Sequence, residues 1–156
     1  MKTLVAYYSR SGATKKIAED IAHKLGADIE RIIDMKDRKG ALGFISGGKD
    51  AVLKHLTKIK PVEKEPQSYD LVIVGTPIWA GTMVPAVRTY LHENMLSKKT
   101  AFFFTASSVG QEKAFGDLCE MAPKSICLAK LNLCSKEIKL GPSEKIEHFI
   151  KTIKSA

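Results

Sequence analysis

The chain has 156 residues, with a formal net charge of +8 and 44% hydrophobic residues. This length suits one domain of about 100–150 residues, so residues 1–156 are expected to form a single domain. No apolar run approaches the roughly 20 residues that a membrane-spanning helix needs, so membrane insertion is not expected. The basic residues are spread along the chain without aromatic platforms between them, which argues against nucleic-acid binding.

The chain alternates predicted strands and helices from end to end. Short apolar, β-branched and aromatic runs indicate strands, and apolar residues recurring every three or four positions indicate helices. In chain order, we expect a strand over residues 3–8, a helix over 15–25, a strand over 28–33, a helix over 49–59, a strand over 70–75, a helix over 85–96, a strand over 100–106, a helix over 111–121, a strand over 125–133 and a helix over 144–153. Ser143 is the expected N-cap of the last helix.

The segment 38–48 stands apart because it contains four glycines and is expected to be a loop. It is either a plain connector or a flexible lid whose Phe44 shields a ligand.

The alternation of elements predicts an α/β fold with a five-stranded parallel sheet and helices on both faces. It is compatible with strand order 2-1-3-4-5, in which ligands sit beyond the carboxyl ends of the strands, at the switch between the first and third. Polar or glycine-containing loops follow the strands that end at Tyr8, Gly75 and Ala106. All three loops would lie at this edge, so we expect a binding site there.

The first of these loops, residues 9–14, has features of a phosphate site. Hydroxyls at Ser9, Ser11 and Thr14 can donate to phosphate oxygens. Gly12 allows close approach of the backbone, and the following helix offers free N–H groups and a positive dipole end. The loop is neither a dinucleotide-binding glycine motif nor a Walker A loop, so it suits a phosphate monoester. A serine-rich capping loop without a ligand is the alternative.

This loop resembles the phosphate loop of the flavodoxin family, (Ser/Thr)-x-(Thr/Ser)-Gly-x-Thr, at every specified position. The likeness extends along the chain in element order, and takes in the second loop, Gly75–Gly81, and, more weakly, Phe102–Gly110. It implies a flavodoxin-like three-layer sandwich with FMN as cofactor, and no catalytic residue or metal. The cofactor-binding residues that it implies are Ser9, Arg10, Ser11, Gly12, Ala13, Thr14, Pro77, Ile78, Trp79, Ala80, Gly81, Ala106, Ser107, Ser108 and Gly110.

The second and third loops differ in how well they match. Trp79 is the only tryptophan, and it either stacks on a flat ring or covers the sheet edge; the resemblance places it beside the isoalloxazine. The third loop offers amides and hydroxyls, but it has no aromatic residue before Phe115, which we expect on the next helix. One face of the flavin is therefore expected to be open or covered only by aliphatic atoms.

The resemblance implies an electron carrier that docks on redox partners. The alternative is an FMN-dependent oxidoreductase that passes hydride from NAD(P)H to a quinone or another small acceptor, favoured by the missing aromatic residue and the glycine-rich insertion. A receiver-type signalling module needs acidic residues after the first strand, where this chain has none.

Charge and thiols complete the expectations. The basic charge predicts partners with acidic docking surfaces and a reduced-flavin couple less negative than in acidic relatives. The scattered Cys119, Cys127 and Cys134 indicate reduced thiols in a cytoplasmic protein.

Overall fold

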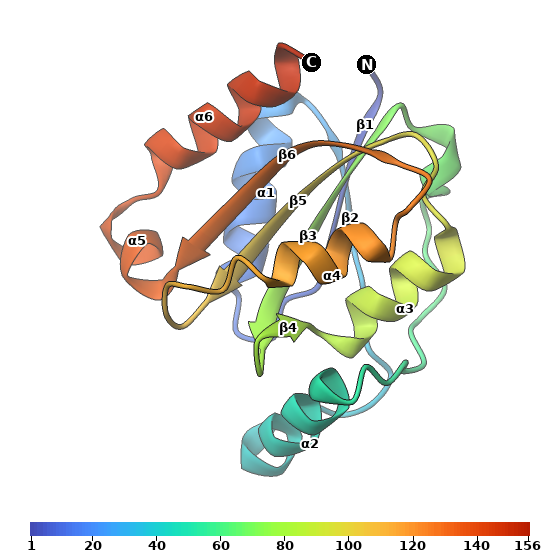
Figure 1. Cartoon of the computed structure of the whole chain (residues 1–156), viewed down its shortest axis with the longest axis vertical. Helices are drawn as coiled ribbons and strands as arrows, with labels where there is room; N and C mark the ends of the chain where they lie inside the picture. Colours follow the sequence, from blue (N-terminus) through green and yellow to red (C-terminus); the bar gives the residue numbers. More distant parts are fainter.

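The computed structural model describes residues 1–156. Its central sheet has the strand order β2-β1-β3-β5-β6 (Figure 1). These strands are β1 (Thr3–Tyr7), β2 (Asp28–Arg31), β3 (Leu71–Trp79), β5 (Lys99–Ala106) and β6 (Ile126–Cys134), and every pairing along the path is parallel. The predicted strand order is confirmed. The short β4 (Thr82–Met83), which pairs antiparallel with the end of β3, was not predicted.

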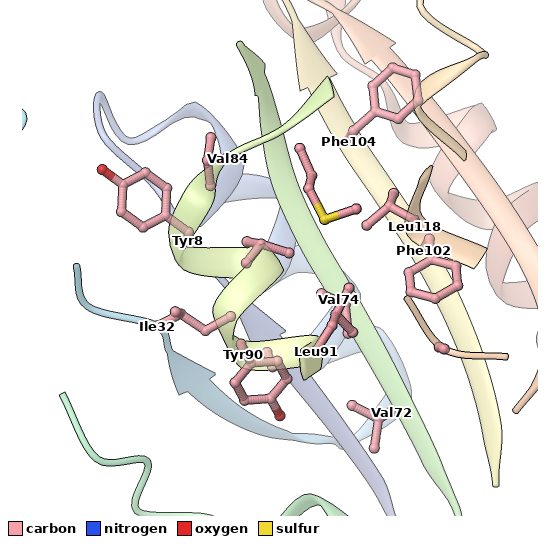
Figure 2. Close-up of a cluster of buried hydrophobic side chains, with 14 of the residues drawn as sticks. Tyr8, Ile32, Val72, Val74, Val84, Tyr90, Leu91, Phe102, Phe104 and Leu118 are labelled. Carbon is pink, nitrogen blue, oxygen red and sulfur yellow. The ribbon is translucent and has the colours of Figure 1, made fainter. Parts of the chain in front are cut away.

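Two pairs of helices cover the faces of the sheet and make it the middle of three layers. Helices α1 (Ala13–Leu25) and α6 (Ser143–Lys154) pack on one face, and α3 (Pro85–Asn94) and α4 (Ala114–Glu120) on the other. Successive residues of β5 point to opposite faces, so Phe102 and Phe104 belong to one apolar cluster and Phe103 to the other. Figure 2 shows the first of these clusters, in which Phe102 and Phe104 project from β5 on the side where Leu118 lies.

The segment expected to be a glycine-rich loop is instead a helix, α2 (Gly40–Val52), and the helix expected over 49–59 was wrong beyond Val52. This helix lies beyond the carboxyl ends of the strands, near β4 (Figure 1). Its buried stripe consists of Gly43, Gly47 and Ala51, each four residues apart. Small residues on the inner face bring the helix close to its neighbours, and tertiary contact outweighs the poor helix propensity of glycine.

An ion-pair cluster anchors α2 to the chain that precedes it. The Arg38 guanidinium lies 3.1 Å from an Asp34 carboxylate oxygen and 2.6 Å from one of Asp50. The side chains of Arg38 and Asp34 are each only 3% exposed. Asp50 belongs to α2, so the cluster fixes the second half of that helix.

Three smaller features differ from expectation or were missed. The short 3-10 turn η1 (Pro66–Ser68) and helix α5 (Ser135–Leu140) were not predicted. Ser143 is the first residue of α6, and Pro142 occupies the N-cap position, so the predicted cap was wrong.

Both chain termini lie at the edge of the sheet away from α2 (Figure 1). The Lys99 ammonium donates to the Ala156 carbonyl at 3.4 Å, which fastens the last residue to the start of β5. None of the helices has the length and apolar character needed to cross a membrane.

Candidate functional site

The three loops meet around one cavity of about 800 Å³ at the carboxyl edge of the sheet. This volume falls within the range of about 300–1,000 Å³ typical of small-molecule sites. The cavity is lined by Ser11, Ala13, Phe44, Ile45, Gly48, Lys49, Val52, Leu53, Pro77, Ile78, Trp79, Ala80, Thr105, Ala106, Ser107, Ser135 and Ile138. A second hollow, of about 560 Å³, runs along β6 and α6 and includes no residue of the three loops.

The amino end of α1 lies at the cavity, and no side chain accepts a hydrogen bond from its first backbone N–H groups. Gly12 takes the N-cap position at φ +100°, so no side chain caps the helix, and no acidic residue lies in its first turn. The Ser9 hydroxyl accepts a hydrogen bond from the Gly12 N–H at 3.1 Å, which holds the loop in shape. Free N–H groups and the positive end of the helix dipole form a site for an anion.

Thr14 has a structural role and does not line the cavity. Its side-chain oxygen lies 2.8 Å from that of Thr105, and the residue is buried. The hydrogen bond joins the start of α1 to the end of β5. Of the three predicted hydroxyls in the first loop, only that of Ser11 belongs to a residue lining the cavity.

The second loop is shorter than expected because β3 continues through Trp79. Ala80 and Gly81 then form a two-residue hairpin to β4, with φ values of +49° and +83°. Positive φ at both central positions is typical of a type I′ turn, and glycine adopts it freely whereas alanine does so only at a cost of about 1–2 kcal/mol. The hairpin is therefore held in place by its surroundings.

Those surroundings are a small polar cluster behind the hairpin. The Thr82 hydroxyl donates to the Asp117 carboxylate and accepts a hydrogen bond from the buried Arg88 guanidinium at 3.1 Å. Burial alone raises the pKa of Asp117, but the Thr82 hydrogen bond and the nearby Lys54 charge outweigh it and leave the pKa below its ordinary value. The ionised carboxylate can thus hold Thr82 and, through it, the turn.

Trp79 lies between two neighbours and still lines the cavity. The Tyr8 ring meets it edge-on, with centroids 5.7 Å apart and an interplanar angle of 89°. On the α2 side, a Cβ at Gly47 would stand 2.6 Å from the indole Cζ3. The indole is therefore fixed on two sides and partly buried, with the cavity as the remaining space beside it.

The third loop contributes Ala106 and Ser107 to the cavity, along with Thr105 from the end of β5. Ser108 and Gly110 line a separate small hollow near Glu137, so the structure does not bring them to the predicted site. Phe115 lies on α4, as expected, where it packs against Phe104 at a centroid distance of 4.6 Å. No aromatic residue of this loop lines the cavity.

The predicted cofactor-binding residues of the three loops differ in whether they line the cavity. Cavity-lining ones are Ser11, Ala13, Pro77, Ile78, Trp79, Ala80, Ala106 and Ser107. Ser9, Gly12, Thr14 and Gly81 shape the loops without lining the cavity, and the Arg10 guanidinium is bonded to the first residue of α2.

No sequence-family profile and no curated protein matches the chain. Solved structures do: a flavoprotein in complex with FMN from Lactobacillus acidophilus NCFM has a TM-score of 0.73 at 24% identity, covering 89% of this chain and 97% of its own. A protein of Bacteroides uniformis ATCC 8492 described as a flavoprotein reaches 0.77 at 22% identity, covering 96% and 97%. The fold is flavodoxin-like. An NADH:FMN oxidoreductase in its apo form shares this fold more distantly, with a TM-score of 0.51 at 16% identity, covering 96% and 88%.

This flavodoxin-like chain has one cavity wall of which sequence reasoning anticipated only Phe44, as the shield of a lid. Helix α2 supplies three apolar side chains that are more than half exposed, those of Phe44, Ile45 and Val52, and the C-cap residue Leu53 adds a fourth. The buried glycines Gly43 and Gly47, four residues apart, were the signal that these residues lie on a helix with a small inner face. Ser135 and Ile138 of α5 complete the lining and had no such signal.

Proposed function

We propose that this chain binds FMN non-covalently and acts as an electron-transfer protein between redox partners. The observation that supports it is one cavity with an anion-binding end at α1 and an apolar end at Trp79 and α2. FMN has the same division, with a phosphate at one end and a flat aromatic ring at the other. The Lactobacillus protein of this fold was crystallised with FMN.

The residues present fit that cofactor in three parts. Ser11 and the free N–H groups of the α1 amino end would hold the phosphate. Thr105 to Ser107 would face the ribityl chain and the pyrimidine edge of the isoalloxazine ring. Trp79 would cover one face of that ring. Large apolar side chains exposed on α2 are typical of a surface that a ligand covers.

Bound FMN would supply the redox chemistry, while the protein sets its access and its electrostatic surroundings. A net charge of +8 favours the anionic reduced cofactor and partners with acidic docking surfaces. The three cysteines are free, which fits the reducing conditions of a cytoplasm.

The test is to add FMN to the purified chain and follow flavin absorbance through gel filtration. We expect one flavin to elute with each chain and to quench the fluorescence of Trp79, the only tryptophan. Stepwise anaerobic reduction should then show two resolved one-electron steps. Flavin that elutes separately from the protein at every concentration would overturn the proposal.

A second function, hydride transfer from NAD(P)H to a quinone or another small acceptor, has one observation in its favour. No aromatic residue of the third loop lines the cavity, and the α2 wall is more than half exposed, so a second flat molecule has room to approach. Anaerobic addition of NADH or NADPH to the FMN-loaded protein separates the two functions. Rapid bleaching in a single two-electron step supports the oxidoreductase, and unchanged absorbance supports the carrier.

A further inference from the structure

Arg10 belongs to the first loop, but its guanidinium is directed to α2. Its Nη2 atom donates to the Gly40 carbonyl at 3.1 Å, and Gly40 is the first residue of that helix. Its Cζ atom lies 5.4 Å from the centre of the Phe44 ring, one turn further along. One exposed side chain therefore bridges the anion-binding loop and the first turn of α2.

We propose that Arg10 is a positioning residue that clamps the amino-terminal turn of α2 to the first loop and so sets the apolar wall of the cavity, and that it is not a ligand of the cofactor phosphate. The effect on flavin binding rests on the proposed function. The clamp itself concerns two parts of this chain and does not.

The first turn of α2 has few other attachments. Lys39, in the N-cap position, forms no side-chain cap, and Gly43 is the only buried residue before Gly47. The strong anchors lie later in the helix, where Arg38 bonds to Ser46 and Asp50. The turn that carries Phe44 and Ile45 toward the cavity thus depends on Arg10 for its side-chain attachment to the rest of the fold.

Both Arg10 contacts would have to break before the guanidinium could turn to a phosphate. A charged hydrogen bond to a carbonyl and a cation–π contact on an exposed ring are each modestly favourable, and together they favour the observed direction. The α1 amino end already supplies N–H donors for an anion, so the phosphate does not require this arginine.

Arg31 provides a matched control. It is also an exposed arginine beside the first loop, with its Nη2 3.5 Å from the Ser9 carbonyl, and it has no recorded hydrogen bond or cation–π contact with α2. Arg10→Met and Arg31→Met each remove one positive charge from the same neighbourhood. Only Arg10→Met also removes the hydrogen bond to Gly40 and the cation–π contact with Phe44.

The first experiment uses the flavin-free chain and hydrogen–deuterium exchange. We expect the amides of residues 44–47, whose N–H groups donate the first backbone hydrogen bonds of α2, to exchange about tenfold faster in Arg10→Met than in the parent chain, and at the parent rate in Arg31→Met. Phe44→Leu should reproduce part of the increase, because it removes the ring that the guanidinium contacts. Equal exchange in the parent and Arg10→Met would overturn the clamp.

The second experiment compares affinities for FMN and for riboflavin, which lacks the phosphate. A clamp predicts that Arg10→Met weakens binding of both by a similar factor, about 5–10-fold, after correction for the charge effect seen in Arg31→Met. A loss confined to FMN would make Arg10 a phosphate ligand and overturn the proposal. Unchanged affinity for both would overturn the link between the clamp and the cavity wall.

The two proposals fail in different ways. A parent chain that binds neither flavin contradicts the proposed function, while the exchange experiment still decides whether Arg10 holds α2.

Discussion

At the scale of single residues, the cavity depends on a close approach that only glycine allows. Trp79 contacts α2 at Gly47, where a Cβ would come within 2.6 Å of the indole. That distance is too short for any real Cβ contact, so a larger residue must displace either the indole or the helix. The adjacent Gly48 has open space around it.

We therefore expect Gly47→Ala to destabilise the protein by about 1–3 kcal/mol, since overpacking strains neighbouring side chains. Gly48→Ala should instead stabilise it by about 0.5–1 kcal/mol, because alanine is the better helix former. Urea denaturation measures both, and the emission maximum of Trp79 should move only in Gly47→Ala. If both variants gain stability, Trp79 does not limit the approach of the helix.

Residues of the site were predictable where the signal is local in the chain. The pattern Ser9–Thr14 between a strand and a helix was enough to place a loop at the amino end of a helix, and α1 does begin at Ala13 without a side-chain cap. The direction of Arg10 and the polar cluster behind Thr82 were not predictable. Both depend on partners more than 25 positions away, Gly40 and Asp117.

At the scale of elements, apolar composition identified β1, β3, β5 and β6 because each of these strands has large side chains in the core. Helix α2 buries glycine and alanine, so it lacks the apolar inner stripe by which an amphipathic helix is recognised. Helix α5 has only six residues, none of them buried, and gave no periodic signal. These two elements complete the cavity, so the helices that were not predicted supply lining residues that, apart from Phe44, were not predicted as part of the site either.

The anchor of α2 can be tested through Arg38. Arg38→Met leaves the carboxylate of Asp34 buried without its partner, and we expect a loss of about 3–5 kcal/mol in unfolding free energy. Lys36→Met is the control. Lys36 pairs with Asp50, as Arg38 does, but its side chain is 50% exposed. This substitution should therefore lower the unfolding free energy by less than about 1 kcal/mol. Chemical denaturation measures both, and similar losses would contradict the anchoring role of Arg38.

Helix α5 introduces a pH dependence through Glu137. The N–H of Cys134, donating at 2.8 Å, and the Lys145 ammonium at 2.6 Å lower the pKa of this carboxyl from an ordinary 4.5 to about 2. A lowered pKa in the folded state stabilises the protein above the unfolded-state pKa, and this contribution disappears as the pH falls from about 4.5 to about 2.

We therefore expect Glu137→Gln to be less stable than the parent chain at pH 7 and nearly equal to it near pH 2. Urea denaturation across this range measures the difference, with Glu93→Gln, an exposed carboxyl without a recorded partner, as the control. A stability difference that stays constant with pH would show that Glu137 acts through packing rather than charge.

At the scale of the whole molecule, the net charge of +8 creates a field that any anionic cofactor experiences. Salt screens this field, because the Debye length falls from about 30 Å at 0.01 M to about 3 Å at 1 M. As the salt concentration rises from about 0.01 M to about 1 M, we expect the two-electron potential of bound FMN to become more negative by on the order of 10–30 mV. Redox titration at several salt concentrations, with free FMN as the control, measures the shift; a positive shift would contradict a stabilising field.

The position of the chain termini has a practical consequence. Both lie at the edge of the sheet away from α2 (Figure 1), while the cavity opens at the carboxyl ends of the strands. A tether attached to either terminus would therefore turn the cavity outward. The same protein could be fixed to an electrode, or fused in tandem to another enzyme, with its site still facing solution.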